Sequence, residues 1–367
     1  MSSDLPRPGR VPLLVLGMVA LVAGTFAGLI RIGWSAPLPA ATSVLDHGPL
    51  MIGAFFSTVI SLERAVALGA RWAYLAPLCA GLSGLALIGG LPGRVAAALA
   101  GAGSLLLLAG SVQVYRRQQA LHTLTLALGA LALCGGNALW LAGAGISTAV
   151  PAWITFLVLT IAGERLELSR FLPPSPTARQ VFAVIVIVML VGALPMPGSL
   201  GAARLLFPVA LVALALWLLR QDVARRTVRE RGLTRFIAVC LLTGYGWLAV
   251  GGLCLLSTGG VLPGTPGYDA GLHAVLLGFV FSMVFGHAPI IFPAILGVRL
   301  PYHRLFYLPL AVLHLSVALR VIATLAGLPM ARSTGGLLNA LALALFVAGT
   351  LASVVRGALA SSADANR

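Results

Sequence analysis

The sequence predicts an all-α, polytopic integral membrane protein. Of its 367 residues, 59% are hydrophobic and only 9% are charged, which is too little charge to cover the surface of a soluble domain of this length. Apolar runs of about 20 residues, the length that crosses a bilayer as a helix, follow one another along the whole chain. Short loops marked by glycine and proline separate them, as in "STGGVLPGTPGYD" at residues 257–269.

Twelve transmembrane helices are expected, and they leave no room for a soluble domain. Residues 1–367 should therefore form a single transmembrane domain, with about 11–356 in the membrane and short termini. The first apolar run follows a basic N-terminus like that of a signal peptide, but it continues to about Trp34 without a clear cleavage site and is interpreted as a span. The predicted spans are 11–33, 45–67, 72–91, 94–114, 120–145, 149–170, 179–197, 201–219, 234–257, 269–295, 303–326 and 334–356.

The charge of +15 comes from arginine, since the chain contains no lysine. These arginines lie in short loops between apolar runs, where anionic lipid headgroups and the positive-inside rule account for them without a nucleic-acid partner. If the N-terminus is inside, most arginines fall on the inner side. The exceptions are Arg320, within a span, and four on the outer side: Arg31, Arg94, Arg204 and Arg332. We therefore expect a multi-pass protein of a bacterial-type inner (cytoplasmic) membrane, with both termini cytoplasmic.

A weak repeat connects the second, sixth and tenth predicted spans. The stretches "FFSTVISLERAVAL", "FLVLTIAGERLELSRF" and "GFVFSMVFGHAPII" align near the inner ends of these spans. The alignment pairs Glu63 with Glu164 and His287, and Arg64 with Arg165. Because the three spans are four apart, the repeat predicts three groups of four helices, a pseudo-threefold (3 × 4) arrangement.

Two of these spans also agree at their outer ends. His47 directly follows Asp46, and His273 lies four residues after Asp269. Each histidine is about one turn into its helix, so the two are expected at similar depth. A glycine follows each histidine, Gly53 after His47 and Gly278 after His273, and a flat ligand is expected to approach the backbone at these glycines. His314, which lies deeper in another span, is a reserve ligand.

Twelve helices in three groups of four resemble the catalytic subunit of heme–copper oxidases. The amino-acid sequences of the second and tenth spans are more similar to those of the NnrS family, membrane proteins associated with heme, copper and the nitric oxide response. The resemblance implies one heme b, its iron held by His47 and His273 from opposite faces. It further implies electron transfer or handling of nitric oxide and nitrosative stress, with quinone or another membrane redox partner. Copper is left open as a second metal, with Met51 four residues after His47.

The sequence also departs from the oxidase pattern. Residues 149–197, which hold the sixth and seventh spans, contain no histidine, and His273 has no histidine two residues away. The resemblance therefore implies no binuclear heme–copper centre, and leaves open whether the protein is a heme-dependent oxidoreductase.

Each candidate site has a structural alternative. For His47 and His273 the alternative is a local role at the interface, with Asp46 and Asp269 as helix N-caps. His287 lies 14 residues beyond His273, about 21 Å along a helix, so it cannot bind the same iron. It is instead expected near the inner side with Glu63 and Glu164, where the cluster would carry protons, bind a quinone headgroup, or hold a second metal together with Met283. The alternative there is an ion-pair network in which Arg64 and Arg165 neutralise the glutamates.

A rival function uses the same polar residues. A transporter for a metal ion, heme or a small solute would employ them as a pathway, since internal repeats and broken helices are common in transporters. A heme clamp needs His47 and His273 level with each other, whereas a transport site is expected near the bilayer midplane. An assembly factor for a terminal oxidase or reductase is a third alternative.

Overall fold

The computed structural model describes residues 4–169, 174–195 and 201–365, and this part of the chain is helical with no strand. Eleven of its helices are long and apolar enough to cross a membrane, which confirms the predicted class of multi-pass helical membrane protein. These spans are Arg7–Arg31, Pro49–Leu68, Arg71–Ile88, Gly93–Arg117, Leu121–Leu141, Ile146–Leu168, Ala203–Gln221, Gly232–Ser257, Pro266–Leu296, Arg304–Leu325 and Pro329–Gly357.

The predicted span 179–197 corresponds to a shorter helix. Helix α7 (Pro176–Gly192) is apolar and has 17 residues, less than the length of the eleven spans. It begins directly at a proline and ends at Gly192, three residues before Pro195, and both residue types favour helix ends there. Residues 196 and 197 of the predicted span, like residue 170 of the preceding one, lie outside the described residues. The expected twelve spans are therefore seen as eleven plus one short apolar helix.

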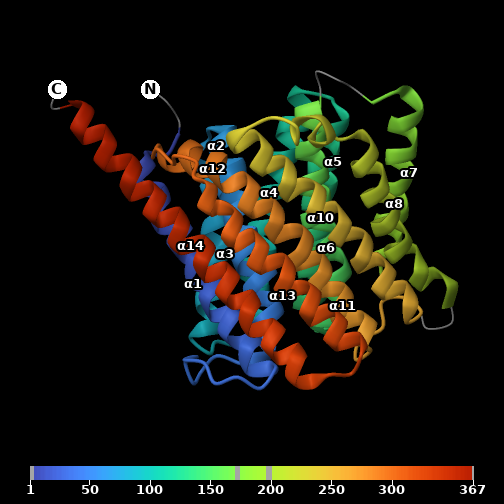
Figure 1. Cartoon of the computed structure of the whole chain (residues 1–367). Helices are drawn as coiled ribbons and strands as arrows, with labels where there is room; N and C mark the ends of the chain where they lie inside the picture. Colours follow the sequence, from blue (N-terminus) through green and yellow to red (C-terminus); the bar gives the residue numbers. More distant parts are fainter. Residues whose placement is uncertain (1–3, 170–173, 196–200, 366–367) are drawn as a thin grey trace. The chain divides into compact units, whose positions relative to one another are not determined.

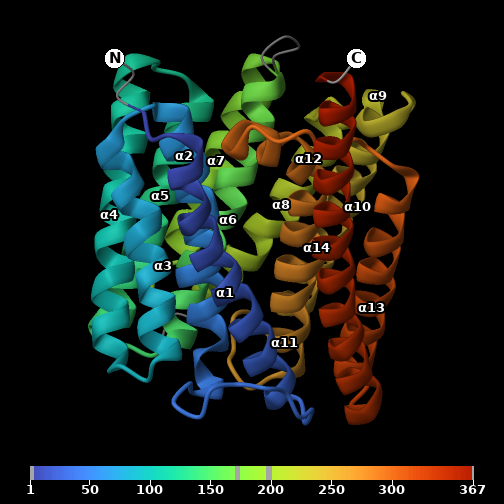
Figure 2. The ribbon, with the colours of Figure 1, turned by 90° about the vertical axis from the view of Figure 1, so that its left-hand side faces the viewer.

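By internal contacts the chain divides into two compact units. Unit 1 comprises Met1–Arg170 and Leu190–Pro195. Its helices pack in chain order, α3 against α4, α4 against α5 and α5 against α6, and Figure 2 shows α3, α4 and α5 side by side. Its elements are α1 (Arg7–Arg31), η1 (Val44–Asp46), η2 (Pro49–Phe56), α2 (Ser57–Leu68), η3 (Arg71–Tyr74), α3 (Leu75–Ile88), α4 (Gly93–Arg117), α5 (Leu121–Leu141) and α6 (Ile146–Leu168).

Unit 2 comprises Phe171–Met189 and Met196–Arg367. Helix α10 contacts α8, α11 and α12, and α13 lies beside α14 (Figures 1 and 2). Most of α7 belongs to this unit, whose other elements are η5 (Gly201–Leu205), α8 (Leu206–Gln221), α9 (Ala224–Thr227), α10 (Gly232–Ser257), α11 (Pro266–His273), η6 (Ala274–Phe281), α12 (Ser282–Leu296), η7 (Arg304–Phe306), α13 (Tyr307–Leu325) and α14 (Pro329–Ala365).

The two histidine-bearing spans share a local irregularity. Just beyond His47 the chain forms the eight-residue π-helix η2, and directly after His273 it forms the eight-residue π-helix η6. Each π-helix is followed by a serine whose hydroxyl donates to a backbone carbonyl of the preceding turn: Ser57 to Ile52 (2.8 Å) and Ser282 to Gly278 (2.5 Å). Wide π turns are rare and occur frequently at functional sites. The similarity of these two spans therefore extends to their backbone.

The three spans joined by the sequence repeat are also the most buried. Buried residues make up 67% of the apolar window in Pro49–Leu68, 78% in Ile146–Leu168 and 67% in Pro266–Leu296. In the other spans of the described chain this share does not exceed 56%. Most residues in the apolar windows of these three spans are therefore covered by other parts of the protein.

A buried amide joins α4, α5 and α6 in unit 1. The Asn137 carboxamide donates to the Ala100 carbonyl (3.0 Å) and accepts a hydrogen bond from the Trp153 indole (2.9 Å). Gly136 permits this arrangement, because a Cβ there would meet the Trp153 ring. The glycines and asparagine in the middle of this span thus serve helix packing.

We expect Asn137→Leu to lower the free energy of unfolding by about 1–3 kcal/mol, because the Trp153 N–H loses its acceptor in a buried site. Unfolding in mixtures of SDS and mild detergent measures this change. Leu131→Ala is the control, since Leu131 lies on the same helix and is 50% exposed. Equal effects of the two substitutions would contradict the assigned role of the amide.

Candidate functional site

His47 lies between η1 and η2 and packs against α1. Its Nδ1 atom is 2.7 Å from the Gly24 carbonyl oxygen. Because a carbonyl only accepts hydrogen bonds, Nδ1 carries the proton and, in the neutral ring, Nε2 carries the lone pair. A Cβ at Gly28 would lie 2.8 Å from two atoms of the imidazole ring. The glycines at 24 and 28, one helical turn apart, therefore make room for this histidine on α1.

The structure tests two sequence-based interpretations of residues near His47, those of Met51 and Asp46. Met51 also packs on α1, since a Cβ at Gly24 would be 2.8 Å from its sulfur, so Met51 and His47 share a neighbouring helix. Asp46 is not the N-cap: the Ser43 hydroxyl accepts from the Leu45 N–H (3.2 Å) instead. The predicted cap is wrong because the helical turn begins before Asp46. Burial raises the pKa of the Asp46 carboxyl, and a backbone hydrogen bond at Ser43 opposes part of that rise.

His273, in unit 2, has the same tautomer as His47. Its Nδ1 atom is 2.7 Å from the Asp269 carbonyl oxygen and 3.3 Å from a carboxylate oxygen of the same residue. Nδ1 therefore donates, and Nε2 has the lone pair. In this structure that lone pair accepts a hydrogen bond from Arg320 Nη2 at 3.0 Å. Metal binding at Nε2 thus requires the Arg320 guanidinium to move aside.

Asp269 is the centre of a charged network at this end of unit 2. Its carboxylate is 3.8 Å from Arg320 Nη2 and 3.2 Å from Arg332 Nη2. The structural alternative that made Asp269 an N-cap is wrong, because Thr265 caps the helix by accepting from Tyr268 N–H, and Pro266 occupies the first turn. One carboxylate between two guanidiniums gives the network a net positive charge.

Sequence reasoning missed the contact between His273 and Arg320, because 47 residues separate the two. One signal was present, however. An arginine within a span is energetically costly unless a neighbouring group accepts its hydrogen bonds, so a hydrogen-bond acceptor was to be expected at the depth of Arg320.

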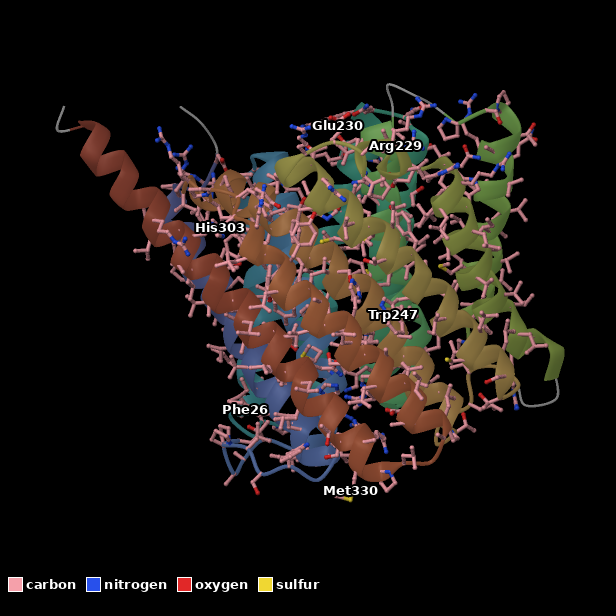
Figure 3. All side chains as sticks on the ribbon, in the orientation of Figure 1. Phe26, Arg229, Glu230, Trp247, His303 and Met330 are labelled. Atoms are coloured by element: carbon pink, nitrogen blue, oxygen red, sulfur yellow. The ribbon has the colours of Figure 1, made fainter. Side chains whose placement is uncertain are left out.

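The glycine after each histidine was expected to expose backbone to a flat ligand. At Gly278 this expectation is wrong, because the Trp247 side chain occupies the space beside it. The Trp247 indole also donates to His314 Nδ1 (2.9 Å), so the neutral His314 ring carries its proton on Nε2 and cannot ligate a metal there. At Gly53 a Cβ would make only an ordinary contact with Trp140 (3.7 Å). In Figure 3, Trp247 lies between the end of unit 2 marked by Arg229 and Glu230 and the opposite end marked by Met330.

Glu63 and Glu164 meet in unit 1 through one arginine. Arg64 Nη2 is 3.0 Å from a Glu63 oxygen and 2.6 Å from a Glu164 oxygen. The exposed fraction of the side chain is 22% for Arg64, 26% for Glu63 and 17% for Glu164, so this ion-pair cluster is largely buried. Arg165, next to Glu164 on α6, is buried. The two glutamates paired by the sequence repeat are therefore neighbours.

His287 belongs to unit 2. Its Nδ1 atom is 2.7 Å from the Met283 carbonyl oxygen, one turn earlier on α12, so it also has the Nδ1–H tautomer. The Met283 side chain is buried against Gly244 of α10. Within the part of the chain that the structure describes, no three or more histidine, cysteine or acidic side chains converge as a metal site.

Together the fold and these polar spans define a polytopic helical membrane protein with ionisable groups inside its spans. Residues 10–355 match the family described as Domain of unknown function (DUF8744), and the chain belongs to that family. No curated protein and no solved structure matches the chain.

Proposed function

We propose that this protein is an integral membrane heme b protein of the NnrS and heme–copper-oxidase-like type, with His47 and His273 as the two iron ligands. The observation that carries the proposal is the tautomer the two histidines share. Each donates Nδ1–H to a backbone carbonyl, which leaves the Nε2 lone pair as the only metal-binding atom of the neutral ring. Ligand histidines in metalloproteins are oriented by this kind of second hydrogen bond.

The residues present fit such a group in chemistry. Two neutral imidazoles are the ligands of a low-spin heme b, and heme bound there would supply one-electron redox chemistry. His47 is held on α1 by the Gly24 carbonyl, and His273 is held by Asp269. Arg320, which now donates to His273, would be released to pair with an anionic group.

Two features support the finer, oxidase-like arrangement of the helices. The three spans joined by the repeat are the most buried, as inner helices of a 3 × 4 bundle should be. Both histidine-bearing spans continue as π-helices of equal length. In this proposal α7 is the twelfth span.

The proposed role is electron transfer or the handling of nitric oxide and nitrosative stress. The electron donor would be quinone or another membrane redox partner, and copper near His47 and Met51 is a further option. The proposed location is a bacterial-type inner membrane with both termini cytoplasmic, since most arginines fall on that side. No binuclear centre is part of the proposal.

Purified His47→Ala and His273→Ala variants are each expected to lose the heme or to hold it in a high-spin form. The wild type should contain one heme per chain, measured as pyridine hemochromogen. His303→Ala is the matched control, because His303 is exposed near the start of α13, where it accepts from the Leu305 N–H. If both variants kept the wild-type spectrum, His47 and His273 would not be the ligands.

A transporter is the second candidate, favoured by one observation. Helix α12 contains Pro289 and Pro293, and prolines inside a span mark the broken helices of transport sites. In that case the protein would be colourless when purified from heme-replete cells. Uptake into proteoliposomes would then depend on Glu63, Glu164 and His287.

A further inference from the structure

Unit 1 contains a cavity of about 380 Å³ that is separate from both histidine ligands proposed above. It lies beside the Glu63 end of α2, and His47 precedes Glu63 by 16 residues, which span about 24 Å at the rise of a helix. Its size is in the range of pockets that hold small molecules. The walls come from α2, α3, α4 and the start of α5, with Glu167 of α6, and much of their surface is apolar, including Leu68, Leu107 and Leu126.

Four ionisable side chains line this cavity: Glu63, Arg64, His122 and Glu167. The Arg64 guanidinium is already engaged by Glu63 and by Glu164, which adjoins the cavity. The Glu167 and His122 side chains make no hydrogen bond or ion pair with any described residue. The Glu167 carboxylate and the His122 imidazole therefore offer acceptors to a ligand that donates hydrogen bonds.

The charge balance selects the sign of the ligand. The cluster holds three carboxylates, Glu63, Glu164 and Glu167, against two guanidiniums, Arg64 and Arg165. Among the described residues of this cluster one negative charge remains, and Glu167 lines the cavity. Arg71, Arg116 and Arg117 are exposed and do not line the cavity. An anion placed here would lie near this excess negative charge at partly buried positions, whereas a cation would be stabilised.

We propose that this cavity binds an organic cation, a protonated amine with a small apolar body. The ammonium group would donate to the Glu167 carboxylate and to the His122 imidazole, which together satisfy two of its three donors. The apolar body would lie against the leucine-lined wall. The proposal does not depend on the heme proposal, because its residues belong to unit 1 alone and His47 does not line the cavity.

The test is isothermal titration of the full-length protein in detergent with benzylammonium, benzyl alcohol and benzoate, three probes of similar shape and different charge. We expect benzylammonium to bind most tightly and benzoate not to bind. Glu167→Gln should weaken benzylammonium at least tenfold, and the control Glu230→Gln, an exposed acid in unit 2, should not change it. Benzoate binding as tightly as benzylammonium, no benzylammonium binding, or an unchanged affinity in Glu167→Gln would each overturn the proposal.

A second variant tests the location of the site. Gly110 lines the cavity, and a Cβ there makes only ordinary contacts, the nearest at 3.6 Å, so Gly110→Leu is expected to fold and fill the space. It should abolish benzylammonium binding while leaving the heme content of the protein unchanged. Retained binding in this variant would place the amine elsewhere and reject the cavity.

An ammonium group could come from a soluble amine or from a lipid headgroup. Repeating the titration with added phosphatidylethanolamine, against phosphatidylglycerol as the anionic control, separates the two sources. Competition by phosphatidylethanolamine alone would assign the cavity to a lipid ammonium, and no competition by either lipid would assign it to a soluble amine. Competition by phosphatidylglycerol alone would overturn the assignment to cations.

Discussion

Arg64→Met is expected to lower the free energy of unfolding by about 3 kcal/mol, the low end of the range for breaking a buried ion pair. The reason is that one guanidinium Nη2 atom serves both Glu63 (3.0 Å) and Glu164 (2.6 Å). Methionine keeps most of the side-chain volume but removes the guanidinium that bridges the two carboxylates. Unfolding in mixtures of SDS and mild detergent, followed by tryptophan fluorescence, measures the change.

The matched control is Arg117→Met, which removes an exposed arginine at the end of α4 and should change stability by less than about 0.5 kcal/mol. Adding Glu63→Gln and Glu164→Gln to Arg64→Met should restore much of the loss, because the two carboxylate charges that Arg64 bridged are then gone. A single Arg64→Met variant as stable as the wild type would show that the cluster does not hold these helices together.

Gly28→Leu is expected to reduce the heme content to that of His47→Ala while the protein remains folded. A Cβ at Gly28 would already be 2.8 Å from the His47 ring, so a leucine must displace the imidazole from the Gly24 carbonyl. Overpacking of this kind costs about 1–3 kcal/mol, which a multi-span protein should tolerate. Heme per chain and the melting temperature in detergent together separate ligand loss from unfolding.

Gly101→Leu is the control for this substitution. Gly101 lies within α4 and a Cβ there meets nothing within 4 Å, so the same change of residue should leave the heme in place. Full heme content in Gly28→Leu would mean that heme binding does not require the His47 ring to pack against α1, and would argue against the role of His47 as a ligand.

Much of the fold follows from the sequence, because apolar length is a strong signal. Hydropathy located the spans, and proline and glycine located most of their ends. The shortfall at α7 has a local cause: its apolar run is closed by prolines and glycines, so the helix ends at Gly192. The capping predictions at Asp46 and Asp269 failed for a related reason. Ser43 and Thr265 compete as caps a few residues earlier, and the helical turns begin there.

The candidate sites were predictable only in part. The sequence repeat predicted that Glu63 and Glu164 lie near each other, and in the structure Arg64 forms ion pairs with both. The partners of His273 were not predictable, because Arg320 comes from another helix and no local pattern records the contact. The same holds for Trp247 beside Gly278, and for the cavity lined by His122. Side-chain packing between distant helices decides all three.

The visible spectrum of the wild-type protein is the most direct test of the proposed bis-histidine heme b. Protein purified in detergent from heme-replete cells would be recorded oxidised and after reduction with dithionite. We expect one heme per chain with sharp α and β bands on reduction, as six-coordinate heme b with two imidazole ligands gives. A colourless wild-type protein, or a high-spin spectrum without those bands, would contradict it.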